Sequence, residues 1–159
     1  MIYPAEPDLQ VSRLAPVTVQ EIITFLTQTD TDFSPPLSQR TDLKSYAEKM
    51  VKNAELIGVR QRGQLTALAA FYCNDFTSRR AYVTYLAVKR DARGAGFGSN
   101  LIRTVSRMAG EAGMRTIELQ IDRARPKLIE FYRRLGFEVA DSYTRYGGHP
   151  AYRLIRKLS

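Results

Sequence analysis

The chain of 159 residues is 44% apolar and 25% charged, a composition typical of one globular domain spanning residues 1–159. Its single cysteine, Cys73, excludes an intramolecular disulfide framework and fits a reducing compartment. The first residues show neither a basic region nor an apolar core, and no stretch is long enough to cross a bilayer. We therefore expect a cytoplasmic protein without a membrane segment.

The charge is distributed unevenly along the chain. Residues 1–78 carry 7 Lys and Arg against 9 Asp and Glu, a net charge of −2, whereas residues 79–159 carry 17 against 7, a net charge of +10. A basic half indicates affinity for a polyanion, either a nucleic acid or a small molecule with several phosphates. A solvated basic surface without a ligand would account for part of the same excess.

Hydrophobic periodicity predicts an alternation of helices and strands. We expect Thr18 to cap the first helix with Glu21 as its capping-box partner, and Gly136 to end the last helix with Phe137 folding back. Residues 29–36 are predicted to be a loop, since Pro35 and Pro36 cannot lie inside a helix. The predicted elements, in chain order, are an edge strand at 9–14, helices at 19–28 and 41–53, strands at 54–60, 64–74 and 81–88, a helix at 98–112, a strand at 115–121, a helix at 126–135 and strands at 137–143 and 151–158.

The strand that ends at Val88 leads into a glycine-rich turn, Arg93-Gly94-Ala95-Gly96-Phe97-Gly98-Ser99, and then into an amphipathic helix. Glycine tolerates positive φ, and amides at a helix N-terminus are available to an anion such as phosphate. The turn is not a dinucleotide fingerprint, because residue 99 is serine, and no Gly-Lys-Ser/Thr of a Walker loop follows. A glycine-rich corner without a ligand is the structural alternative.

The remaining pattern, Arg-x-x-Gly-x-Gly, resembles the pyrophosphate-binding motif of the GNAT superfamily of acetyl-CoA-dependent N-acetyltransferases. Downstream, the run from Phe131 through Tyr132 to Gly136 and Phe137 resembles the Phe-Tyr-x-x-x-Gly-Phe signature of the same family. The resemblance covers residues 40–140 well and the first forty loosely. It implies a mixed α/β (α+β) fold, with a central twisted sheet of about six to seven strands flanked by about four helices.

This resemblance also implies acetyl-CoA as the cofactor and gives roles to individual residues. Backbone groups of Leu86 and Val88 would bind the pantetheine arm, and a main-chain N–H near Leu86 would stabilise the acetyl oxyanion. Tyr132 would protonate the leaving thiolate, although periodicity alone would make it a core aromatic. The expected cofactor-binding residues are Leu86, Ala87, Val88, Arg93, Gly94, Ala95, Gly96, Phe97, Gly98, Ser99, Arg125 and Tyr132, with Tyr132 and Leu86 catalytic.

The sequence departs from the family pattern at two positions. Many members carry glutamate two residues before the strand leucine, where this chain has Thr84, and asparagine seven residues before the tyrosine, where it has Arg125. The first difference leaves the general base open among Glu118, Asp122, His149 and a chain of water molecules. The second removes one cofactor contact and offers a cation for phosphate instead. We expect no metal site, because one histidine and one cysteine cannot form a usual zinc site.

Acceptor specificity is encoded less clearly. In the family the loop between the first two helices and the turn before the glycine-bearing strand cover the acceptor, and Asp32 or Asp75 could here hold a cationic amine. We expect a small amine, such as an amino sugar or an amino-acid-like compound, and a monomer or homodimer. The alternatives are a protein or peptide N-acetyltransferase and a catalytically silent acyl-CoA sensor. A nucleic-acid-binding module is disfavoured, because it would need exposed aromatic residues among its basic ones, whereas the aromatic residues here follow apolar periodicity. The expected acceptor-binding residues are Phe33, Arg40, Asn74, Asp75, Tyr82 and Thr84.

Overall fold

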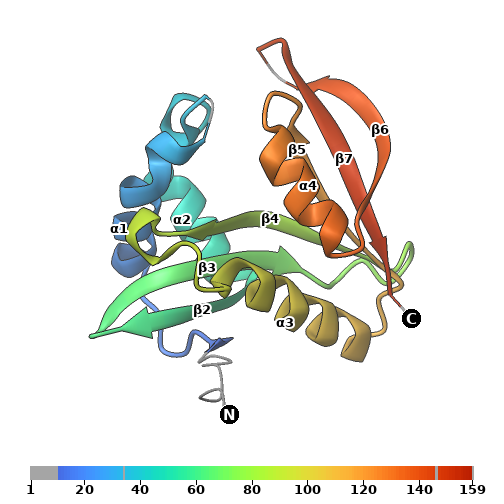
Figure 1. Ribbon diagram of the computed structural model, residues 1–159. Coiled ribbons are helices and arrows are strands. Elements are labelled where there is room, and N and C mark those ends of the chain that lie inside the picture. The colour runs from blue at the N-terminus through green and yellow to red at the C-terminus, as the bar shows by residue number, and fades with distance from the viewer. Residues whose placement is uncertain (1–10, 34, 146, 159) are drawn as a thin grey trace, which may run out of the picture. The chain divides into compact units, whose positions relative to one another are not determined.

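The computed structural model describes residues 11–33, 35–145 and 147–158. Within these ranges it contains four α-helices and a seven-stranded mixed sheet in the order β1-β2-β3-β4-β5-β7-β6, so the predicted fold class is confirmed (Figure 1). The elements are β1 Ser12–Arg13, α1 Val19–Thr29, η1 Asp30–Asp32, η2 Leu37–Gln39, α2 Leu43–Asn53, β2 Glu55–Gln61, β3 Gln64–Tyr72, β4 Arg80–Val88, η3 Arg90–Ala92, α3 Phe97–Glu111, β5 Thr116–Asp122, α4 Pro126–Arg134, β6 Glu138–Arg145 and β7 His149–Lys157, where η marks a 3-10 turn.

The chain divides into two compact units. Unit 1 comprises residues 1–72 and 84–105, and unit 2 comprises residues 73–83 and 106–159. The boundaries pass through β4 and α3, so each of these elements contributes its two ends to different units. The glycine-rich turn therefore belongs to unit 1, and the Phe-Tyr-x-x-x-Gly-Phe segment belongs to unit 2.

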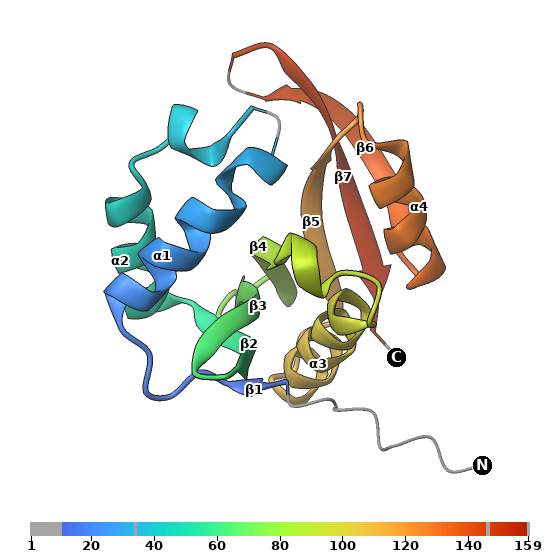
Figure 2. The same ribbon diagram turned by 60° about the vertical axis from the view of Figure 1, so that its left-hand side comes forward.

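Unit 1 is built around α1 and α2, which lie side by side (Figure 2). Apolar residues of both helices pack with side chains of β2, β3 and β4, and Phe25 and Met50 are fully enclosed. Strands β2 and β3 are joined at Arg62 and Gly63, whose φ values of 54° and 77° suit a two-residue hairpin turn. The apolar faces predicted for these helices are therefore the faces that build the core of unit 1.

Several predicted boundaries in unit 1 need correction. Helix α1 continues through Thr29, whose hydroxyl donates to the carbonyl of Phe25 at 2.9 Å, and the 3-10 turn Asp30–Asp32 lies within the predicted loop. Thr18 accepts the amide of Glu21 at 3.0 Å as predicted, but the Glu21 carboxylate pairs with Arg60 instead of completing a capping box. Asp42 caps α2, which begins two residues later than predicted. Leu9 of the predicted edge strand lies outside the described residues.

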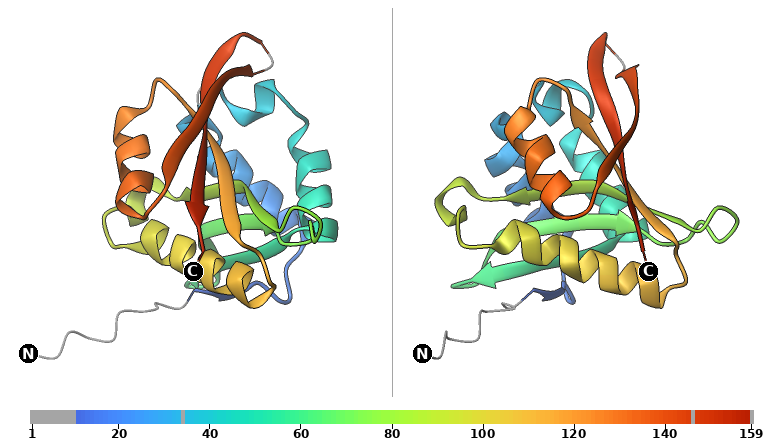
Figure 3. Two further views of the ribbon diagram at one scale, coloured as in Figure 1. Left: turned by 90° about the vertical axis from the view of Figure 1, so that its right-hand side faces the viewer. Right: turned by 45° about the vertical axis from the view of Figure 1, so that its right-hand side comes forward.

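Unit 2 consists of antiparallel β5, β7 and β6 together with α4, the first residues of β4 and the last residues of α3. Strands β6 and β7 form a long hairpin (Figure 3). Residues 80–82 of β4 run parallel to residues 116–118 of β5, as expected for strands connected through a helix. Pro126 begins α4 and Gly136, with φ of 90°, ends it, so that the amide of Phe137 bonds to the carbonyl of Tyr132 at 3.1 Å. Both predicted end signals are confirmed.

Glu118 is a buried carboxylate of unit 2, although it alternates with apolar residues along β5. Its carboxylate binds Arg153 at 2.7 Å and Arg80 at 3.2 Å, and Arg153 also binds Asp141 at 3.1 Å. Because these guanidinium groups offset its charge, the carboxylate can be buried on the polar face of the sheet.

Candidate functional site

The glycine-rich turn has the geometry of an anion site. Gly94 and Gly96 have φ values of 85° and 87°, which L-residues with a Cβ rarely adopt. The first intrahelical bond of α3 joins the amide of Asn100 to the carbonyl of Gly96 at 3.1 Å. The amides of Phe97, Gly98 and Ser99 precede this bond, so helix geometry provides them with no carbonyl acceptor within α3. The turn thus presents N–H groups at the positive end of a helix dipole.

The side chain of Arg93 forms hydrogen bonds with Val88, at the entry to this turn, and with Asp32. Its Nε donates to the carbonyl of Val88 at 3.2 Å, and its terminal nitrogen donates to Asp32 at 2.7 Å. Arg90, in the 3-10 turn just before it, donates to the other oxygen of Asp32 at 3.0 Å. The arginine of the motif therefore has acceptors within unit 1, and no local pattern indicates Asp32 as its partner.

Strand β4 enters the turn with alternating side chains. Tyr85 and Ala87 belong to the core of unit 1, whereas Thr84, Leu86 and Val88 are half-buried. The hydroxyl of Tyr46 donates to the carbonyl of Thr84 at 3.0 Å. Tyr85 is hydrogen-bonded to the Thr29 hydroxyl, and burial raises the pKa of the Tyr85 phenol well above its usual value. Leu86 is thus half-buried on the strand that leads into the turn, and its role in catalysis stays a prediction.

Tyr132 is a buried phenol of unit 2. Its ring makes edge contacts with Phe131 and Phe137, at centroid distances of 5.1 and 5.5 Å. Burial raises the pKa of Tyr132 well above its usual value, and the positive charge of Arg125 partly opposes this shift. The group therefore carries its proton throughout the neutral range, which is the state a general acid needs before reaction.

The candidate bases all belong to unit 2 and differ in their surroundings. The Glu118 carboxylate forms ion pairs with the guanidinium groups of Arg80 and Arg153. Asp122 accepts the amide of Ala124 at 2.8 Å and lies 3.9 Å from a nitrogen of Arg145. His149 is half-buried at the start of β7, opposite Arg145 of β6.

The expected acceptor residues are divided between the units. In unit 1, the ring of Phe33 lies 5.3 Å from that of Tyr85, and Arg40 is exposed after η2.

In unit 2, Asn74 and Asp75 are exposed in the turn before β4, while Tyr82 is half-buried on that strand. Asp75 accepts the amide of Ser78 at 3.0 Å and also its hydroxyl, and these bonds lower the pKa of Asp75. Phe76 of the same turn is 69% exposed.

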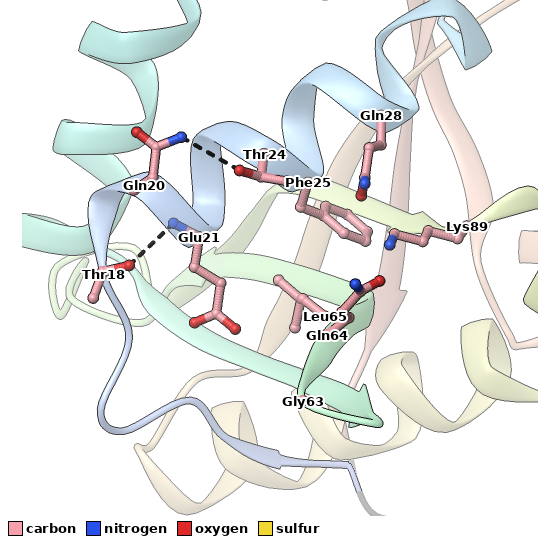
Figure 4. A pocket seen from close by; sticks show the side chains of 10 residues that line it. All are labelled: Thr18, Gln20, Glu21, Thr24, Phe25, Gln28, Gly63, Gln64, Leu65 and Lys89. Atoms are coloured by element: carbon pink, nitrogen blue, oxygen red, sulfur yellow. Dashed lines mark hydrogen bonds between the residues drawn. The ribbon is translucent and has the colours of Figure 1, made fainter.

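A pocket of about 320 Å³ in unit 1 was not predicted (Figure 4). Figure 4 shows the ammonium group of Lys89 near the amides of Gln28 and Gln64. None of the expected site residues lines this pocket, and its polar residues gave no signal because they occupy ordinary exposed positions of a helix and a hairpin. The lining residues are Thr18, Gln20, Glu21, Thr24, Phe25, Gln28, Gly63, Gln64, Leu65 and Lys89.

A seven-stranded mixed sheet with four helices and a glycine-rich turn before α3 is the fold of the acetyltransferases that this chain is similar to. Residues 21–137 match the sequence pattern that describes the acetyltransferase (GNAT) family, and the chain belongs to this family. A search of curated protein sequences found no significant match.

Solved structures of several acetyltransferases share this fold. The ribosomal-protein-S18-alanine N-acetyltransferase from Escherichia coli is 19% identical, with 94% of this chain and 93% of that chain covered and a TM-score of 0.75. The aminoglycoside 6′-N-acetyltransferase from Enterococcus faecium is 13% identical, with 95% and 98% covered and a TM-score of 0.75. Ard1 from Thermoplasma volcanium is 17% identical, with 94% and 97% covered and a TM-score of 0.74. At these identities the similarity shows the fold alone.

Two features are absent from the described residues. In residues 11–33, 35–145 and 147–158, no helix is long and apolar enough to cross a membrane. Over the same part of the chain, no three or more His, Cys, Asp or Glu side chains are grouped so that they could hold a metal ion.

Proposed function

We propose that this chain transfers the acetyl group of acetyl-CoA to the primary amine of a small molecule by direct attack. The observation that carries the proposal is the turn before α3, where two positive-φ glycines precede three amides that lack an acceptor within the helix. Such amides suit a pyrophosphate, and the net charge of +10 in residues 79–159 suits a ligand with several phosphates. Membership of the GNAT family makes acetyl-CoA the natural ligand of this kind.

Unit 1 would supply the binding groups. Acetyl-CoA brings a thioester, which is an activated acyl group with a good leaving group. Amides of residues 93–99 would bind the pyrophosphate, and main-chain groups of Leu86, Ala87 and Val88 would bind the pantetheine arm. An N–H near Leu86 would stabilise the oxyanion. The carbonyl of Val88 already accepts a bond from Arg93, so we assign pantetheine binding mainly to Leu86.

Unit 2 would supply the proton transfers. Tyr132 would protonate the leaving thiolate, and its raised pKa keeps the phenol in the acid form. Arg125 stabilises the phenolate electrostatically, which makes proton donation easier, and could also bind phosphate. The Glu118 carboxylate is already paired with Arg80 and Arg153. We therefore favour His149 or a water chain as the acceptor of the amine proton.

The surroundings of two carboxylates disfavour a polycationic acceptor. Asp32 and Asp75 were the expected partners of a cationic amine. Asp32 binds Arg90 and Arg93, and Asp75 binds the amide and hydroxyl of Ser78. These contacts leave both carboxylates less able to hold a polycationic substrate such as an aminoglycoside.

A thiol-release assay with acetyl-CoA tests the proposal. The panel should contain amino acids, amino sugars, aminoglycosides and short peptides, and the variants should be Tyr132→Phe and, as a matched control, Tyr143→Phe. We expect turnover of a small amine, with Tyr132→Phe reducing kcat by about 10²-fold or more while coenzyme A still binds. Turnover of peptides alone would favour a protein acetyltransferase, and tight binding without turnover of any amine would favour the acyl-CoA sensor.

A further inference from the structure

We propose that Asp32 is a positioning residue that holds the arginine of the Arg-x-x-Gly-x-Gly motif and so couples the segment after α1 to the phosphate-binding turn. The proposal rests on the proposed function, because it takes the turn to be the site for coenzyme A. It assigns the Arg93 side chain a structural task and leaves phosphate binding to the backbone. All the contacts that carry it lie within unit 1.

The first step concerns the shape of the turn. Arg93 donates through Nε to the carbonyl of Val88 and through its terminal nitrogen to Asp32. Between Val88 and Arg93 the backbone makes a 3-10 turn, in which the amide of Ala92 bonds to the carbonyl of Lys89 at 2.9 Å. The guanidinium group of Arg93 thus closes residues 88–93 into a loop, and the chain continues from Arg93 directly into Gly94 and Gly96.

The second step concerns the anchor. The Asp32 side chain is only 11% exposed, whereas Arg90 and Arg93 are 76% and 46% exposed. Asp32 itself lies on a constrained turn, because neighbouring Asp30 accepts the amide of Ser38 at 2.9 Å. The carboxylate is therefore the more enclosed partner, and the two more exposed guanidinium groups converge on it.

The third step gives the sign of the expected effect. Removing a negative charge near a phosphate site would by itself strengthen the binding of an anion. Loss of Asp32 would also leave two guanidinium groups close together without their shared counterion, so that they repel each other and Arg93 no longer fixes the turn. If positioning dominates, replacing Asp32 weakens the binding of coenzyme A, although the change makes the chain more positive.

The fourth step connects the turn to the expected acceptor side. Phe33 directly follows Asp32, and its ring contacts that of Tyr85 on β4 at a centroid distance of 5.3 Å. A ligand that orders Arg93 would order Asp32 and Phe33 with it. Coenzyme A and an acceptor that contacts Phe33 would then be thermodynamically linked, so that each of these two ligands would strengthen the binding of the other.

Calorimetric titration with coenzyme A tests the proposal without any known acceptor. The variants are Asp32→Asn, the conservative Asp32→Glu, and Asp91→Asn as the matched control, which removes the same charge from an exposed position of the 3-10 turn beside Arg90. We expect Asp32→Asn to raise the Kd about five- to tenfold, the scale of a partly exposed ion-pair network, and Asp32→Glu to recover part of this loss. Asp91→Asn should leave the Kd unchanged or lower it.

The outcomes separate this proposal from the proposed function. If the unaltered chain does not bind coenzyme A, the proposed function itself fails. If it binds, and Asp32→Asn binds as tightly or more tightly, then the charge effect dominates and the positioning role is wrong. Should Asp32→Asn not fold, Arg93→Gln breaks the same ion pair from its more exposed side, and an unchanged Kd for that variant would equally overturn the proposal.

Discussion

The hydroxyl of Tyr46 donates to the carbonyl oxygen of Thr84 at 3.0 Å and lies 2.9 Å from the Thr84 hydroxyl, which joins α2 to β4 immediately before Tyr85 and Leu86. Tyr46→Phe removes the hydrogen bond and leaves a partly buried carbonyl without this donor. We expect a loss of about 1 kcal/mol in the free energy of unfolding, measured by urea denaturation. Thr84→Val keeps the carbonyl bond and should cost less; an equal or larger loss for this variant would contradict the assignment.

Replacing Gly96, in the turn before α3, and Gly110, inside α3, by alanine should change the stability of the chain in opposite directions. Gly96 has φ of 87°, so Gly96→Ala places a Cβ in a left-handed conformation and should cost about 1–2 kcal/mol of stability. Gly110 lies inside α3 with open space at its Cβ position, so Gly110→Ala should stabilise the chain by about 0.5–1 kcal/mol. Thermal unfolding measures both changes. Gly96→Ala should also weaken the binding of coenzyme A, whereas Gly110→Ala should not.

The buried Tyr132 should make the chain sensitive to alkali. Because burial raises its pKa, the folded state keeps this proton at a pH where the unfolded chain has lost it. The contribution to stability is constant below the unfolded pKa of about 10 and falls above it by about 1.4 kcal/mol per pH unit. Tyr132→Phe should flatten the decline in the free energy of unfolding between pH 10 and 11, and an unchanged slope would argue against a buried phenol. Tyr85 should add a similar slope of its own, since burial raises its pKa too.

The ion pair of Glu21 and Arg60 should make the free energy of unfolding depend on pH in the acidic range. The hydrogen bonds from Arg60 lower the pKa of Glu21 from its ordinary value of 4.5. A depressed folded pKa means that the stabilisation is present above about pH 4.5 and is lost as the pH falls through the folded value. Glu21→Gln should therefore lower the free energy of unfolding at pH 7, by about 1 kcal/mol or less, and change it little at pH 2. Denaturant titrations at both pH values make the comparison.

Local signals in the sequence were sufficient for much of the fold. Thr18, Pro126 and Gly136 mark helix ends through their own backbone or capping chemistry, and each does so in the structure. The glycine-rich turn could be recognised for the same reason, because the conformations of Gly94 and Gly96 are a property of the residue type.

Long-range polar contacts could not be read from the sequence. The ion pairs of Glu118 could not be anticipated, because its partners Arg80 and Arg153 lie 38 and 35 residues away. Asp32 looked like an acceptor ligand, because Arg93 is 61 residues away. In both cases the partner that determines what the carboxylate does lies on another element. Ion pairs of this kind depend on topology, which periodicity does not specify.

The division of the chain into units has a consequence for dissecting the protein. Unit 2 needs residues 73–83 as well as residues 106–159, and the breaks at residues 83 and 105 fall inside a strand and inside a helix. No single cleavage or terminal truncation therefore releases either unit as a continuous polypeptide. Fragments made by cutting α3 or β4 would each end in an incomplete element, so split-protein complementation would have to restore a helix or a strand before any activity returned.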